Sequence, residues 1–261
     1  MKRILWILAL VVGAVMLETS CVKEDRTPCP CWLDVFLGEK TSSEVVLCIW
    51  PNTDNLLSET LSEEMFSPFV EREVRRGFNL LSAFERKGQL SSTGTRIITA
   101  EGQQCDSLYA CSDLVNCTGE FAVDTIRFHK QFATLYLQIL NPLEVDYPYT
   151  LTIRGNVCGM DLSSFRPVDG KFSYTPVLNE EFLGTCRLPR QNDNSLAIEM
   201  ARADDGSPVD TIPLGELIAA TGYDWKAVDL NDIVIKIDFA KADISVTVNE
   251  WHSDYTYEIE I

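Results

Sequence analysis

The sequence predicts an all-β protein made of two antiparallel β-sandwich domains with one or two short helices. The chain has 261 residues, of which 46% are hydrophobic and 23% charged, a balance typical of folded globular proteins. That length allows two domains of ordinary size. From Pro30 onward, apolar and polar residues alternate in short runs separated by turn residues, as they do in half-buried strands.

The first predicted domain covers residues 30–123 and has short strands, which we expect at residues 78–84, 96–99, 107–114 and 120–123. Residues 56–76 mix acidic and apolar side chains, and Pro68 would interrupt a single helix there. We therefore expect a loop with a turn or two of helix. Longer and more regular strands follow residues 124–129, and this change places the domain boundary at Asp124.

The second predicted domain, residues 124–261, has the clearest alternation. Runs with one apolar and one polar face cover residues 134–139, 151–153, 233–239, 244–248 and 255–261. One-sided strands of this kind suit antiparallel sheets with a single buried face, and two such sheets pack as a sandwich. Residues 213–221 begin with Pro213 and stop before Gly222, which predicts a short crossover helix.

The last run, residues 255–261, keeps its alternation to the end of the sequence. We expect its apolar residues to be buried against another strand, because an unsupported terminal segment would fray. Only residues 250–254 separate it from the preceding run, so a hairpin within the same sandwich is the shorter connection. Donation of the strand to a neighbouring subunit is the alternative.

The N-terminus is typical of an export signal. A basic start is followed by residues 4–17, which carry no charge and are fewer than the roughly 20 apolar residues that span a bilayer. Small residues then precede Cys21, a pattern that resembles a bacterial lipoprotein box. We expect residues 1–20 to be a cleaved signal peptide and Cys21 to carry the lipid, with diacylglycerol on its sulfur and palmitate among the acyl chains. An ordinary secretory signal with a chance cysteine is the alternative.

Residues 21–29 form a predicted tether. Lys23, Glu24 and Asp25 look like the Lys-then-acidic signature that follows the lipidated cysteine in surface-exported lipoproteins. This pattern predicts a surface-export signal and a protein that faces outward. A solvated charged tether without an address is the alternative, since short charge runs are usually just solvated.

The charge and the histidine content narrow the function. Lys+Arg 22 against Asp+Glu 39 gives a net charge of −17, which repels phosphate backbones, so we expect no nucleic-acid partner. Only His129 and His252 could act as general bases near neutral pH, and we expect both to be structural. The sequence therefore predicts no enzyme and no cofactor. A hydrolase with paired carboxylates is the weakest alternative.

The chain has nine cysteines, and lipidation of Cys21 would leave eight. An oxidising compartment favours disulfides, although the sequence does not choose among the many possible connectivities. Cys158 and Cys186 are the only cysteines after residue 124, so we predict a bond between them. No C-x-x-C pair or nearby histidine completes a zinc site, and we expect no metal.

Four segments carry a resemblance to a known family. They are residues 26–30 (Arg-Thr-Pro-Cys-Pro), 128–135 (Phe-His-Lys-Gln-Phe-Ala-Thr-Leu), 153–159 and 248–251 (Val-Asn-Glu-Trp). Together with the lipoprotein signal, they resemble the FimB-like fimbrial anchor lipoproteins of Bacteroidetes-type V pili, over nearly the whole mature chain. The resemblance implies two tandem transthyretin-like β-sandwich domains, a lipidated N-terminus in the cell outer membrane, and attachment at the cell-proximal end of a fimbrium.

The leading hypothesis is therefore a surface-exposed outer-membrane lipoprotein that anchors or caps a fimbrium, a structural pilus subunit in cell adhesion. The resemblance implies fimbrial subunits as partners through β-strand addition, which uses main-chain hydrogen bonds and needs no catalytic residue. The outer membrane would be reached through the N-terminal lipid. The alternative is a surface glycan-binding β-sandwich lipoprotein, which would need two or three Trp or Tyr side chains on one open face.

Overall fold

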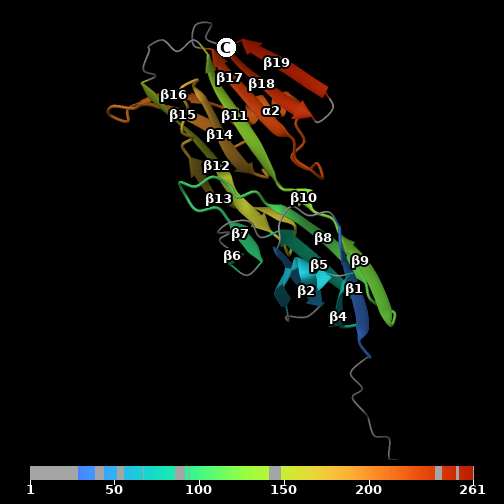
Figure 1. Ribbon diagram of the computed structural model, residues 1–261. Helices are drawn as coiled ribbons and strands as arrows, with labels where there is room; N and C mark the ends of the chain where they lie inside the picture. Colours follow the sequence, from blue (N-terminus) through green and yellow to red (C-terminus); the bar gives the residue numbers. More distant parts are fainter. Residues whose placement is uncertain are drawn as a thin grey trace, which may run out of the picture.

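The computed structural model describes residues 29–38, 44–51, 56–66, 68–85, 92–93, 95–140, 148–238, 243–250 and 253–260. Across these residues the protein consists mostly of β-strands in several sheets, so the predicted all-β sandwich class is confirmed. Figure 1 shows two β-rich units stacked end to end in an elongated molecule. No helix in the described part of the chain is long and apolar enough to cross a membrane.

The first sandwich packs a three-stranded sheet, β4-β1-β9, on a five-stranded sheet, β10-β8-β5-β2-β3. The strands are β1 (Cys31–Leu37), β2 (Glu44–Pro51), β3 (Leu57–Ser62), β4 (Val70–Val74), β5 (Phe78–Glu85), β8 (Tyr109–Asn116), β9 (Phe121–Ile126) and β10 (His129–Lys130). Its core forms because each strand turns alternate residues inward. Leu33 and Val35 of β1 are fully buried and share a cluster with Leu47 of β2 and Leu81 of β5.

The second sandwich packs sheet β14-β11-β17-β18-β19 on sheet β16-β15-β12-β7-β6, with β13 also paired to β12. The strands are β6 (Ser92–Thr93), β7 (Arg96–Ile98), β11 (Phe132–Leu140), β12 (Tyr149–Asp161), β13 (Arg166–Tyr174), β14 (Leu183–Pro189), β15 (Ala197–Arg202), β16 (Pro208–Ile212), β17 (Asp232–Asp238), β18 (Asp243–Glu250) and β19 (Ser253–Glu260). The predicted crossover helix is α2 (Leu214–Ala220). Its Leu214 and Ile218 are buried in the core cluster to which both sheets contribute.

Residues 56–76 differ from the predicted loop. They form strands β3 and β4 on either side of the 3-10 turn η1 (Glu63–Phe66). The strands are short, and each buries few residues among charged and polar ones: Leu61 on β3, and Val70 and Val74 on β4. Tertiary contacts rather than local pattern therefore decide their structure.

The chain passes from one sandwich to the other later than the predicted boundary at Asp124. Strand β9 stays paired with β1 as far as Ile126, and β10 pairs with β8. Only at β11, directly after Gln131, does the chain enter a sheet of the second sandwich. In addition, the β6–β7 hairpin from the first half of the sequence pairs with β12 of the second sandwich.

Two strand pairs depart from the predicted antiparallel pattern, because β1 pairs parallel with β9 and β11 pairs parallel with β17. In both cases the chain runs through the opposite sheet before it returns. Such a long connection is what a parallel pair requires, whereas a hairpin can join only antiparallel strands.

A shared core cluster fixes the two sandwiches to each other. Phe84 of β5 packs in one cluster with Ile97 of β7 and with Met160 on β12. Gly159 allows β7 to lie against β12, since a Cβ at this position would collide with the Ile97 carbonyl oxygen. The carboxylate of Asp161 then accepts hydrogen bonds from the Thr95 hydroxyl at 3.1 Å and from the Arg96 side chain at 3.4 Å. The junction is therefore packed and strand-paired.

Candidate functional site

The C-terminal hairpin forms an edge of the second sandwich. Strand β19 runs antiparallel to β18 over its whole length, with Tyr257 in register with Val246 and Ile259 with Ile244. The predicted hairpin within the same sandwich is therefore confirmed. Strand β19 is the last strand in the order β14-β11-β17-β18-β19, so one side of its backbone is unpaired among the described strands. Such an edge can accept a further strand through main-chain hydrogen bonds.

Strands β17 and β18, which precede β19 in the sheet, are packed into the core of the second sandwich. Ile233 and Ile235 of β17 and Val246 of β18 are completely buried in the core cluster of the second sandwich. Strand β17 pairs in register with β18 along seven residue pairs, from Asp232↔Asn249 to Asp238↔Asp243. The edge strand β19 therefore pairs with a sheet that is packed into the core.

The N-terminal strand and the C-terminal edge lie at opposite ends of the molecule. In Figure 1, β1 lies with β4 and β9 at one end, while β19 lies beside β18 at the other. Strand β1 begins at Cys31, and Cys29 just before it is exposed. The protein could therefore be attached at one end through the chain that precedes Cys29, and at the opposite end through β19.

A cleft of about 680 Å³ lies at the junction of the sandwiches. Segments far apart in sequence line it, among them Phe165 and Arg166 at the start of β13, Asn192 after β14, and Trp225 and Lys226 before β17. Its volume is within the range of ordinary ligand pockets.

Hydrogen bonds hold the walls of the cleft. The Asn192 side-chain amide donates to the Asp169 carboxylate at 2.9 Å, and His129 pairs with Asp229 at 3.1 Å. The cations Arg166 and Lys226 are exposed and are not paired with any acidic side chain of the described residues. In a chain with a net charge of −17, these two cations stand out among the residues that line the cleft.

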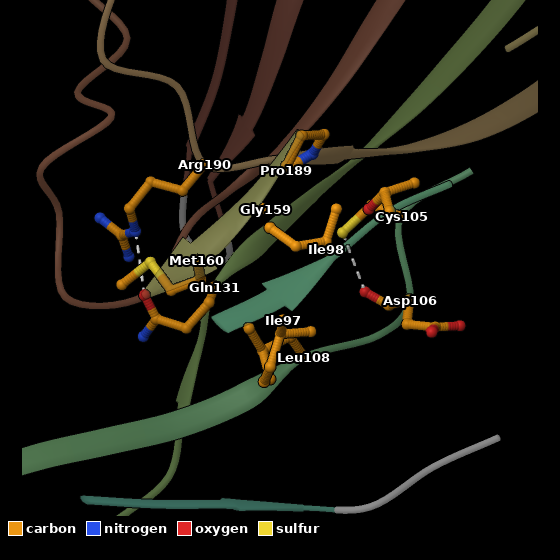
Figure 2. Close-up of a pocket in the computed structure, with 11 residues that line it drawn as sticks. Ile97, Ile98, Cys105, Asp106, Leu108, Gln131, Gly159, Met160, Pro189 and Arg190 are labelled. Carbon is orange, nitrogen blue, oxygen red and sulfur yellow. Dashed lines mark hydrogen bonds between the residues drawn. The ribbon is translucent and has the colours of Figure 1, made fainter. Parts of the chain in front are cut away.

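A second, smaller cavity in the junction encloses about 20 Å³. Figure 2 shows Ile97, Leu108 and Met160 among its walls, with Arg190 bonded to Gln131 on one side and the Cys105 sulfur donating to the Asp106 carbonyl on the other. This space holds at most about one water molecule, so it is a packing defect of the junction and not a ligand site.

The predicted surface-attachment residues lie outside the described part of the chain. These are the lipidation candidate Cys21 and the export-signal candidates Lys23, Glu24 and Asp25. The signal peptide, residues 1–20, also lies outside it, as do His252 and Trp251. The predicted tether, residues 21–29, enters the structure only at Cys29, which is exposed.

Cys158 and Cys186, the predicted disulfide pair, are free thiols in the structure, as is every cysteine of the described residues, Cys31 and Cys117 included. Cys186 lies on β14 and belongs to the core cluster between the two sheets. Cys158 lies on β12 and packs over Gly170 of β13, with its sulfur 3.7 Å from the Val168 carbonyl oxygen. The two thiols pack against different neighbours, and the bond between them stays a prediction.

No group of three His, Cys, Asp or Glu side chains within the described residues is placed to hold a metal ion. The cleft residues Arg166, Asn192, Trp225 and Lys226 were not among the residues that the sequence singled out. They come from three separate segments and belong to no local motif, so no signal in the sequence could have found the cleft.

No protein-family model matches the chain, and no curated protein matches its sequence. Solved structures do match its fold. A proposed polysaccharide-binding protein from Bacteroides thetaiotaomicron has a TM-score of 0.63 and 13% identity, covering 88% of this chain and 98% of its own. A proposed adhesin from Bacteroides ovatus has a TM-score of 0.58 and 10% identity, covering 91% and 99%.

The fimbrial anchor protein Mfa2 from Porphyromonas gingivalis is a third match. Its TM-score is 0.55 at 10% identity, and the alignment covers 87% of this chain and all of the Mfa2 chain. The chain has the fold of these surface proteins. The match extends over both sandwiches, which makes it a likeness of the whole two-sandwich arrangement. At such low identity it establishes the fold alone.

Proposed function

We propose that the protein is an outer-membrane lipoprotein that anchors or caps a fimbrium at the cell surface. Cys21 carries the lipid, and the edge of β19 pairs with a strand of a fimbrial subunit. The observation that carries this proposal is the position of β1 and β19 at opposite ends of a rigid, elongated body. A protein that connects a membrane to a fibre needs attachment points at its two ends and no catalytic residue.

The shared fold supports this proposal, because a protein named as a fimbrial anchor has the same two-sandwich arrangement. The free edge of β19 supports it as well, since strand addition requires an unpaired backbone edge on a stable sheet. Lys23, Glu24 and Asp25 would direct the lipoprotein to the outer face of the membrane, where fimbrial subunits are available.

The proposal is tested by separating membrane attachment from fimbrial attachment in cells. Cys21→Ala should move the protein, and the fimbriae bound to it, from the membrane fraction into the medium. Cys29→Ala is the matched control, because it changes an exposed cysteine of the same segment and should leave the protein membrane-bound. If the Cys21→Ala protein stays in the membrane fraction and the native protein carries no lipid, the anchoring role is wrong.

A second function, surface glycan binding, is favoured by the junction cleft. Trp225 is the one Trp or Tyr side chain in its lining, fewer than the two or three expected of an open aromatic platform, so recognition would depend on Arg166 and Lys226, which would bind the carboxylate of an acidic sugar. Calorimetric titration with a uronic-acid oligosaccharide and with a neutral one of equal length tests it. Binding of the acidic sugar that is lost in the double variant Arg166→Ala, Lys226→Ala would support this function, and no binding of either sugar would reject it.

A further inference from the structure

Two buried cysteines meet at one corner of the first sandwich. Cys31 is the first residue of β1, and Cys117 directly follows β8. Both are free thiols in the structure, both side chains are completely buried, and both belong to the same core cluster. They come from facing sheets, since β1 lies in the three-stranded sheet and β8 in the five-stranded one.

The backbone around them fixes this meeting point. Cys31 is in register with Val74 at the end of β4, where the chain leaves the smaller sheet. Cys117 exchanges two backbone hydrogen bonds with Gly77, where the same connection enters the larger sheet, at 2.8 and 3.2 Å. From the other side, the Trp32 amide donates to the Glu120 carbonyl at 2.8 Å, in the turn that follows Cys117. The short β4–β5 connection and the β8–β9 turn therefore lie next to the two thiols, one on each side.

The Cys31 thiol lies close enough to Cys117 to affect the pKa of Cys117. Burial raises the pKa of Cys117 to about 11; a hydrogen bond with the Asn79 side chain opposes this rise, and the neighbouring Cys31 thiol reinforces it. Cys158 and Cys186 show no such effect on each other: burial raises the pKa of both, and the thiol that adds to the rise at Cys186 is Cys105. Shared burial in one cluster and the effect of Cys31 on Cys117 thus distinguish the pair in the first sandwich from the pair that the sequence suggested.

We propose that Cys31 and Cys117 form a disulfide bond when the chain folds in an oxidising compartment. Two S–H bonds break and one S–S bond forms, while two electrons and two protons pass to the disulfide of a thiol oxidoreductase or of glutathione, which becomes two thiols. This inference requires the export on which the proposed function also rests, but it does not depend on a fimbrial partner.

The bond forms during folding rather than afterwards. A thiolate is the attacking species in thiol–disulfide exchange, and both thiols are inaccessible once β1 has docked. The reduced protein in the folded state should therefore be oxidised slowly, whereas the refolding chain should be oxidised readily.

The bond would reinforce the N-terminal strand where a tether pulls on it. Strand β1 continues directly from the segment that leads back to Cys21, so a force on that segment acts first on Cys31. Without a cross-link, β1 can peel away from β4 and β9 one hydrogen-bonded pair at a time. A covalent link from Cys31 to the opposite sheet transfers the load past β1 into the body of the sandwich.

Peptide mapping of the full chain tests the proposal without any variant. The purified protein is reduced, unfolded, refolded with reduced and oxidised glutathione, alkylated and digested without reductant. We expect a peptide containing Cys31 joined to one containing Cys117, with the mass lower by about 2 Da for the two hydrogens lost. In the denatured but unreduced protein, Cys31→Ser should make Cys117 reactive to maleimide, and Cys117→Ser should do the same for Cys31. Cys48→Ser, a buried cysteine of the same sandwich, should leave the bond intact.

Reduction of the bond should also lower the Tm of the wild-type protein by roughly 5–10 °C and leave that of Cys31→Ser unchanged. Alkylation of both cysteines in refolded, unreduced protein would overturn the proposal, and so would a map that joins either of them to another cysteine. If the bond forms in vitro and in protein recovered from the cell envelope, the proposal holds even when Cys21 carries no lipid. If it forms in vitro only, the pairing geometry holds, but the premise of export is wrong.

Discussion

Arg190 offers a quantitative test of the junction between the sandwiches. It follows β14, and its guanidinium donates hydrogen bonds to the Gln131 side chain at 2.9 Å and to the carbonyls of Trp225, Ala227 and Val228 at 2.6, 2.8 and 3.2 Å. Gln131 is the residue at which the chain passes between the sandwiches. A single side chain thus ties the crossing point to the loop that walls the cleft.

Replacing Arg190 with Ala removes these four hydrogen bonds. Each bond to a charged donor contributes about 1.5–3 kcal/mol net, but they share one charge, and burial opposes that charge, as the lowered pKa of Arg190 indicates. Water can also reach part of the vacated space. We therefore expect the free energy of unfolding to fall by about 3 kcal/mol, well below the sum, which corresponds to a Tm lower by roughly 6–12 °C.

Thermal unfolding followed by circular dichroism measures this loss. Arg154→Ala is the matched control, since Arg154 pairs with Glu199 at 2.8 Å on an exposed strand face. An exposed pair contributes at most about 1 kcal/mol, so this control should melt within about 4 °C of the wild type. An Arg190→Ala protein that melts like the Arg154→Ala control would show that the four bonds do not stabilise the junction, and the reasoning would be wrong.

Three further predictions concern other parts of the structure. Deleting residues 255–261 removes most of β19 and uncovers β18, so the free energy of unfolding should fall by roughly 3 kcal/mol in a denaturant titration. An unchanged unfolding midpoint together with lost fimbrial association would show that the strand is donated to a neighbouring subunit. Ser82→Ala removes hydrogen bonds to the Ser112 hydroxyl and the Leu162 carbonyl across the junction and should cost about 1–2 kcal/mol in the same titration; no loss would contradict it. Burial raises the pKa of Asp161, but hydrogen bonds from Ser163, Thr95 and Arg96 outweigh burial and lower it. The stabilising effect of the ionised Asp161 is therefore present above about pH 4 and lost as the pH falls through the folded-state pKa. The Tm difference between wild type and Asp161→Asn should shrink on acidification, and a difference that stays constant would contradict this prediction.

Strand alternation gave reliable predictions where a strand has one buried face. The runs at residues 134–139, 233–239 and 244–248 became β11, β17 and β18, and Leu135, Ile235 and Val246 on these strands are buried in a core that both sheets share. The pattern failed at residues 56–76, where β3 and β4 bury only one and two residues. So short an alternation looks like a loop until the neighbouring strands are in place.

Long-range arrangement could not be predicted from local pattern. The sequence contains no sign that the β6–β7 hairpin leaves its own half of the chain to pair with β12, since that pairing depends on the close approach at Gly159. The cysteines show the same limit. Sharing a domain suggested Cys158 and Cys186, whereas the shared burial of Cys31 and Cys117 depends on how the two sheets of the first sandwich close, which local pattern does not contain.

The site-specific crosslinking of β19 in living cells tests the central claim most directly. A photoreactive amino acid at Thr256, in the middle of the edge strand, is activated on fimbriated cells, and the adducts are identified by mass spectrometry. The control carries the same photoreactive amino acid at Thr211, on the edge strand β16 of the other sheet. The proposed anchor predicts an adduct between Thr256 and a fimbrial subunit and none from Thr211. Adducts from Thr256 only within the chain itself, or equal capture of the subunit from both positions, would contradict attachment through β19.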